Sequence, residues 1–173
     1  ANLSSASGSQ VTLSRLGSAL ETGQLVVGNE GSAHLTVEAA ASATSDSAII
    51  GRHSTSVASV AGDGSTWVTG DLQVGGDVAD PGGASGNGTL NVTAGGTVKS
   101  TAARLGSVAG ATGAAIIDGE GSALTVDSGG LAIGDAGTGS LTVTGGGIVS
   151  SQAVVLGNSA ASTGSARISG AGS

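Results

Sequence analysis

The chain has 173 residues, of which 34 are glycine and only one, Trp67, is aromatic. Its formal net charge of −7, with no basic cluster to offset it, disfavours binding to nucleic acid or to anionic lipid. Glycine without a three-residue period excludes collagen, and a charged fraction of only 10% with recurrent Val, Ile and Leu disfavours a disordered chain.

The sequence repeats itself at a period of about 50 residues. Each repeat opens on a Gly-Ser pair, and the three repeats cover approximately 17–63, 64–120 and 121–173. Repeats of this length are typical of solenoids, in which each unit packs on its neighbours. We therefore expect residues 1–173 to form a single solenoid segment, cut from a longer protein.

Short apolar bursts with a period of two recur along the chain. In order they are Leu25-Val26-Val27, Leu72-x-Val74, Leu90-x-Val92, Leu124-x-Val126, Leu131-x-Ile133 and Leu141-x-Val143. This alternation predicts short strands with one buried face, and no glycine-free helical stripe accompanies it. In the third repeat, strands are expected near residues 125, 132, 142, 149, 155 and 167. Because six strands are too many for one coil with three sheets, each repeat is expected to form two coils of about 25 residues.

The predicted fold class is all-β: a right-handed parallel β-helix, or β-solenoid, of about seven coils with two coils per repeat. Parallel strands stacked coil on coil satisfy the backbone, and the crossover rule favours right-handed winding. The alternative is an antiparallel sandwich or barrel, a fold that would not explain why the sequence repeats at about 50 residues.

Glycines at recurring positions mark the predicted corners. Six of them directly follow Val, Ile or Leu at a strand end: Gly28, Gly51, Gly75, Gly106, Gly134 and Gly157. Corners need a positive φ or a close backbone approach, and glycine provides both. The doublets at 95–96, 129–130 and 145–146 are assigned to a third recurring turn. In the first repeat, residues 38–43 replace that glycine turn, and a relaxed turn is expected there.

The second repeat contains an insertion. From the Leu of the Leu-x-Val-Gly motif to the Leu of the next strand, nine residues intervene in repeats one and three, and seventeen intervene in repeat two. The additional residues lie within 76–88 and predict a loop that projects from one corner, where solenoids often place binding residues. The candidate binding residues are Asp77, Val78, Asp80, Pro81 and Asn87. The alternative is a neutral loop that the solenoid tolerates.

A search for chemistry yields no catalytic, cofactor-binding or metal-binding residues. His34 and His53 have no zinc-ligand spacing and are expected to be solvated surface residues. The carboxylate pairs at 77 and 80 and at 118 and 120 are the candidates for sugar hydrolysis, but ordinary corner acids are the preferred interpretation.

Two further features bear on binding. Trp67 aligns with Leu20 and Leu124 of the other repeats, which predicts a core position rather than a platform for sugars. An ice-binding solenoid would need Thr-x-Thr on consecutive coils, and only Thr142-Val143-Thr144 fits that pattern.

The repeat motifs carry a resemblance to a known family. The pattern reads G-x-L-x-V-G at 70–75, G-x-L-x-V at 88–92, G-G-x-V-x-S at 95–100 and A-x-I-x-G-x-G-S at 115–122. Over residues 17–173 it resembles the passenger domains of adhesin-type autotransporters, which Gram-negative bacteria export by type V secretion. The resemblance implies a β-helix stalk at the bacterial cell surface, with an outer-membrane β-barrel in the parent protein outside this chain.

The function expected from this resemblance is that of a non-enzymatic surface stalk in adhesion, biofilm formation or virulence. Its partners would be a host surface protein, a glycan or another copy of the chain, and no cofactor or nucleic acid is expected. Two alternatives remain open: a carbohydrate-active β-helix of the tailspike or lyase kind, and a passive spacer within a larger adhesin.

Overall fold

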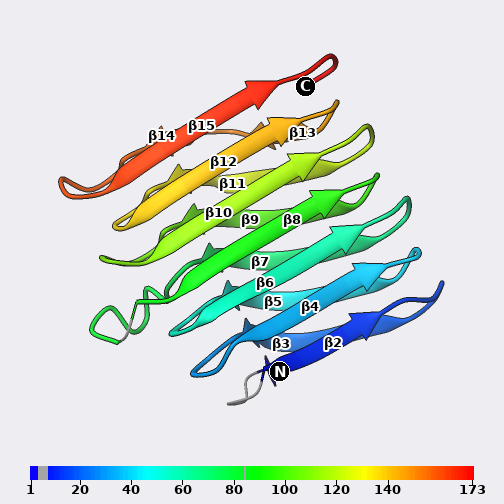
Figure 1. The fold of residues 1–173 in the computed structure, drawn as a ribbon, viewed down its shortest axis with the longest axis horizontal. Helices are drawn as coiled ribbons and strands as arrows, with labels where there is room; N and C mark the ends of the chain where they lie inside the picture. The colour runs from blue at the N-terminus through cyan, green and yellow to red at the C-terminus, as the bar shows by residue number, and fades with distance from the viewer. Residues whose placement is uncertain (4–7, 84) are drawn as a thin grey trace.

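The computed structural model describes residues 1–3, 8–83 and 85–173, which form two parallel β-sheets wound into a solenoid (Figure 1). Sheet A contains β1 (Asn2–Leu3), β3 (Ala19–Val27), β5 (Ser42–Ile50), β7 (Thr66–Val74), β9 (Thr97–Leu105), β11 (Ala123–Ile133), β13 (Ile148–Ser151) and β14 (Val154–Leu156). Sheet B contains β2 (Ser9–Leu13), β4 (Ala33–Glu38), β6 (Thr55–Ala61), β8 (Asn87–Thr93), β10 (Thr112–Asp118), β12 (Thr138–Thr144) and β15 (Thr163–Ser169).

The coils stack in register. Thr112 pairs with Thr138, 26 residues later, and Thr138 pairs with Thr163, 25 residues later. This spacing confirms two coils per 50-residue repeat and the all-β parallel solenoid. The described residues make about six turns, close to the expected seven, because a long loop and an incomplete first coil use residues without adding a turn. No helix occurs in these residues, so none is present that is long and apolar enough to cross a membrane.

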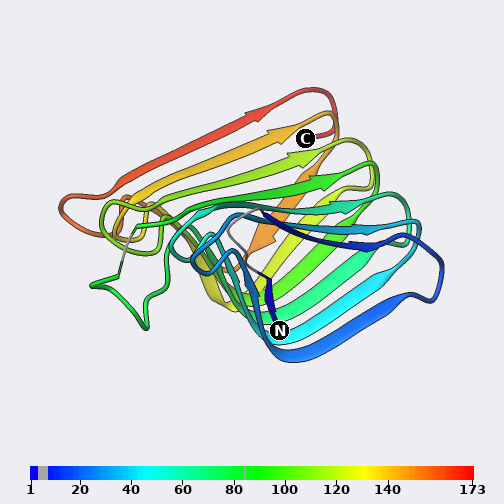
Figure 2. The same cartoon turned by 60° about the horizontal axis from the view of Figure 1, so that its bottom comes forward.

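Sheet A is bent, so the cross-section has three sides although only two sheets close it (Figure 2). In the last coil the bend separates β13 from β14, whereas in the coil before it the strands expected near 125 and 132 are one strand, β11. The register of β11 shifts between Val126 and Gly130. The doublet at 129–130 therefore lies at this bend, and its assignment to the same turn as 95–96 and 145–146 is wrong.

The core is a set of apolar columns that run along the axis. One column places Ala43, Trp67, Val98 and Leu124 in successive coils, and all four side chains are buried. Trp67 has 0% exposure, and its Nε1 lies 3.4 Å from the hydroxyl of Ser45. The core position predicted for Trp67 is confirmed, and the small Ala43 beside it leaves room for the indole.

All six corner glycines have positive φ, between 67° and 82°. At Gly75 a Cβ would lie 2.2 Å from the carbonyl oxygen of Thr112, because β10 of the following coil begins against this corner. A second glycine column faces the corners at the start of the sheet B strands, and it was not singled out from the sequence. It consists of Gly88, Gly113, Gly139 and Gly164. Two backbones thus approach each other closely at the corners formed by Gly51, Gly75, Gly106 and Gly134.

The turn at residues 38–43 is not relaxed, contrary to the expectation. Ala39 and Ala40 have φ values of 54° and 60°, and Ala94 in a later coil has 51°. Ala39 follows Glu38, which pairs with Ala61, so its equivalent in the next coil is Gly62, where φ is 90°. The turn keeps its left-handed geometry without glycine and carries the associated strain.

We expect Ala39→Gly to raise the free energy of unfolding by about 1 kcal/mol, since the left-handed region costs an L-residue about 1–2 kcal/mol and the additional freedom of glycine in the unfolded chain offsets part of the gain. Urea unfolding followed by circular dichroism measures the change. Ala109→Gly is the control, because Ala109 is exposed and does not have a positive φ. If Ala39→Gly lowered the free energy of unfolding as much as Ala109→Gly does, the backbone at Ala39 would not be strained.

Candidate functional site

The inserted segment forms a loop between β7 and β8 that extends beyond the corners of the other coils (Figures 1 and 2). Thr55 pairs with Asn87 across 32 residues, compared with 25 for the next pair, Asn87 and Thr112. Of the five candidate binding residues, Val78, Pro81 and Asn87 are exposed; Val78 has 43% exposure. The tip of the loop therefore presents apolar and small side chains to solvent.

Both acidic candidates contact the solenoid, but only Asp77 is buried, whereas the side chain of Asp80 has 40% exposure. Asp77 has 4% exposure, and its carboxylate forms an ion pair of 2.9 Å with Nε of Arg52 in the preceding coil. Its other oxygen accepts a hydrogen bond from the backbone N–H of Ala79 at 2.9 Å. The backbone N–H of Val78 donates to Oε1 of Gln73 at 2.8 Å. These contacts fix the first turn of the loop against the underlying sheet.

His53 lies beneath the loop and is not solvated as expected. Its side chain has 11% exposure, with Nδ1 at 2.9 Å from Glu30 and Nε2 at 3.1 Å from Asp80. A Cβ on Gly83 would lie 2.5 Å from Nε2, so the loop passes directly over the ring. Only the protonated imidazole can donate from both nitrogens to both carboxylates. His34 sits elsewhere, half-buried on the outer face of β4.

These contacts belong to a charged seam that continues along the same side of the solenoid. Nε2 of Gln73 donates to Asp71 at 3.2 Å, and Arg104 forms ion pairs with Asp71 and with Asp135, the latter at 3.3 Å. Nδ2 of Asn158 donates to Asp135 at 2.7 Å. The charged seam comprises Glu30, Arg52, His53, Asp77, Asp80, Gln73, Asp71, Arg104, Asp135 and Asn158. Arg104 and His53 each lie between acids from the preceding and the following coil, while Arg52 pairs with Asp77 and Asp80 of the loop.

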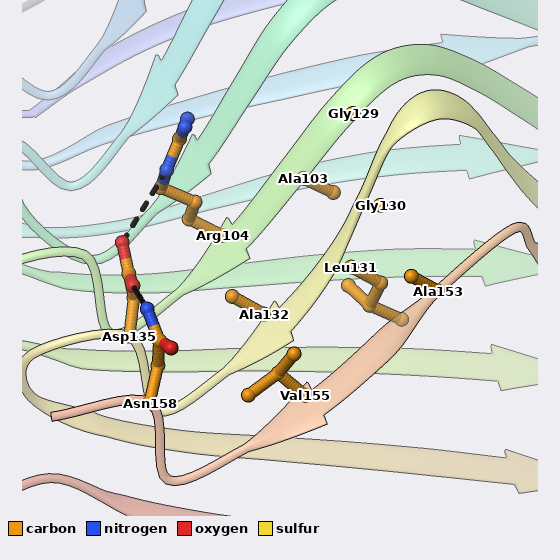
Figure 3. Close-up of a pocket in the computed structure, with 10 residues that line it drawn as sticks. All are labelled: Ala103, Arg104, Gly129, Gly130, Leu131, Ala132, Asp135, Ala153, Val155 and Asn158. Atoms are coloured by element: carbon orange, nitrogen blue, oxygen red, sulfur yellow. Dashed lines mark hydrogen bonds and ion pairs between the residues drawn. The ribbon is translucent and has the colours of Figure 1, made fainter.

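A small groove of 190 Å³ lies beside Arg104 (Figure 3). Figure 3 shows Arg104, Asp135 and Asn158 along one side of it, and small residues such as Gly129, Gly130 and Ala132 form much of the rest. The charge of Arg104 is already met by two carboxylates, so the groove is not suited to an anion.

Three of the four candidate carboxylates, Asp77, Asp80 and Asp118, each contact a neighbouring side chain. At the base of the loop, Asp77 pairs with Arg52, and Asp80 lies 3.1 Å from Nε2 of His53. Asp118 accepts a hydrogen bond from the hydroxyl of Thr144 at 2.5 Å, while Glu120 is exposed in the following turn. In the described part of the chain, no group of three or more His, Asp and Glu side chains is arranged to hold a metal ion.

We expect Arg52→Ala to loosen the loop while the solenoid stays folded. Removing one partner of a buried ion pair leaves the other charge uncompensated, which costs about 3 kcal/mol. Hydrogen exchange at the backbone amides of Val78 and Ala79 should accelerate strongly. Arg167→Ala, on an exposed arginine of the last strand, is the control and should leave both amides unchanged. Equal exchange in the two variants would show that Arg52 does not hold the loop.

Comparison with models of protein families, with curated proteins and with solved structures found no match to this chain.

Proposed function

We propose that the chain is a non-enzymatic surface stalk, of the kind that adhesin-type autotransporters display, and that the loop between β7 and β8 makes contact with its partner. The observation that carries the proposal is the anchoring of this loop. Asp77, at 4% exposure, ties the loop to Arg52, while Val78 at 43% exposure and Pro81 remain at the surface.

A loop held in one conformation loses less entropy on binding than a mobile one. Because the ion pairs hold only the base of the loop, its exposed tip is free to meet a partner without being reordered. The stacked coils supply the stiffness of a stem, since each coil is bonded to the next through both sheets. The partner is proposed to be a protein or glycan on a host surface, or a neighbouring copy.

The carbohydrate-active alternative is less well supported, because the carboxylates of the loop are paired with Arg52 and His53. The spacer alternative is separated from the proposal by experiment. Cells displaying the chain are compared with cells whose chain carries the short corner Asp135-Ala136-Gly137 in place of residues 77–86. We expect adhesion to host cells, or aggregation between bacteria, to fall to the level of non-displaying cells.

A second displayed variant, Arg52→Ala, tests the anchoring itself. It retains the exposed tip of the loop but not the ion pair, so we expect weaker adhesion than in the parent chain. Unchanged adhesion after replacement of the loop, with display confirmed on the cell surface, would overturn the proposal and favour a passive spacer.

A further inference from the structure

The outer face of sheet B carries a regular array of hydroxyl and amide groups. Four neighbouring strands, β8, β10, β12 and β15, pair over seven residues each without a register shift. Of their sixteen outward positions, seven are Thr, three are Ser and two are Asn, which makes twelve neutral polar side chains. We call these sixteen positions the hydroxyl face.

The register supplies what the sequence does not show. Thr142-Val143-Thr144 is the only Thr-x-Thr in the chain, and in the neighbouring coils Thr142 lies beside Ile116 and Arg167, while Thr144 lies beside Asp118 and Ser169. The clearest column runs through Asn87, Thr112, Thr138 and Thr163, all exposed and in successive coils. Along β12 the outward side chains are Thr138, Ser140, Thr142 and Thr144. The polar side chains therefore extend in two directions, along β12 and along this one unbroken column.

The repeats of this array follow from sheet geometry. Strands lie about 4.7–4.9 Å apart, and outward residues along a strand recur every two residues, at roughly 6.6 Å. Threonine is stiff at χ1, so its hydroxyl and methyl hold their places. On the prism surface of ice, water oxygens also repeat at two unequal distances in perpendicular directions, one close to the strand spacing and one somewhat longer than the spacing along a strand.

The charge of the hydroxyl face matches a neutral partner. The chain carries −7 overall, but this face contains one acid, Asp118, and one base, Arg167, which sum to zero. Hydroxyl groups both donate and accept, so they can pair with water molecules of either orientation. Sugars would favour an aromatic platform, and the only aromatic residue, Trp67, is buried in the core.

We propose that the hydroxyl face binds the surface of ice. Many weak contacts act together because the sheet holds the side chains at fixed spacings, so little entropy is lost beyond the first contact. Ala114 and Ile116 on β10 interrupt the hydroxyls but are small or apolar, and Arg167 lies on the outermost strand. The proposal does not rest on the surface stalk, since the hydroxyl face shares only Asn87 with the candidate residues of the loop.

The test compares the purified chain with two lysine variants in an ice-recrystallisation assay. The parent chain should slow the growth of ice grains relative to an equal mass of an unrelated acidic protein. Thr142→Lys places a bulky charge in the centre of the hydroxyl face and should abolish most of this effect. Thr44→Lys, on the exposed outer face of sheet A, should retain it.

Circular dichroism verifies that each variant is folded. If Thr142→Lys unfolds, Thr142→Val replaces it, because valine has nearly the shape of threonine but lacks the hydroxyl. Thr142→Val should cause a partial loss of the inhibition of ice-grain growth. The proposal is overturned if the parent chain does not slow grain growth, or if the Thr142 and Thr44 variants behave alike. Retention of the parent chain on insoluble cellulose or chitin, lost in Thr142→Lys and without any effect on ice, would assign this face to a polysaccharide instead.

Discussion

Gly75→Ala is expected to lower the free energy of unfolding by about 4 kcal/mol, because two independent costs meet at this corner. A positive φ, here 80°, costs an L-residue about 1–2 kcal/mol. A Cβ would also lie 2.2 Å from the carbonyl oxygen of Thr112, and crowding of this kind costs about 1–3 kcal/mol or more. Urea unfolding followed by circular dichroism measures the sum.

Two other glycines separate these costs. Gly17 has a φ of 82° but no atom within 4 Å of a Cβ, so Gly17→Ala should lose only the conformational part. Gly113 does not have a positive φ, but a Cβ would lie 2.0 Å from the carbonyl oxygen of Val74, so Gly113→Ala should lose only the crowding part. Equal losses in all three variants would mean that close coil packing does not decide the choice of glycine.

Trp67→Ala is expected to cost about 3–5 kcal/mol, since it removes the largest fully buried side chain and leaves a cavity between coils. The nearest coils offer Ala43 on one side and Val98 on the other, and neither side chain can fill the space. Because the chain has no other tryptophan, circular dichroism replaces fluorescence as the measure of unfolding. The exposed neighbour Val68 is the control, and Val68→Ala should change stability by less than about 1 kcal/mol.

The pairing of Ala43 with Trp67 can be tested by enlarging the side chain at position 43 and reducing the one at position 67. Ala43→Leu alone should overpack the column and cost about 1–3 kcal/mol. Combined with Trp67→Leu, the same change should cost less than the sum of the two single changes, with a coupling of about 1 kcal/mol. Strict additivity would contradict the stacking of these two residues in neighbouring coils.

The sequence was sufficient to predict the features that recur in every coil. The six corner glycines follow an apolar strand each time, and the alignment of Trp67 with Leu20 and Leu124 placed it correctly in the core. The same type of residue recurs at such positions in each repeat, so the pattern is distinguished from a chance occurrence. The column that contains Gly113 had the same kind of signal, in the recurring G-x-L-x-V, but its purpose appears only where two backbones meet.

The charged seam could not be predicted, because its partners are separated by an entire coil. Glu30, His53 and Asp80 come together only once the register and the path of the inserted loop are known. The doublet at 129–130 was misassigned for a related reason, since glycine serves equally at a corner and at a bend within a strand. The strained alanines had no signal at all: Ala39 occupies a glycine position without being glycine.

Cysteine crosslinking tests the in-register parallel stacking most directly, and the chain has no cysteine of its own. Thr44 pairs with Val68 and Ser42 pairs with Thr66, and strand spacing is within the Cα separation of a disulfide. We predict that cysteines at 44 and 68, and separately at 42 and 66, form a disulfide readily under mild oxidation, whereas the crossed pairs 44 with 66 and 42 with 68 do not. Rapid oxidation of either crossed pair, or of only one in-register pair, would contradict the solenoid.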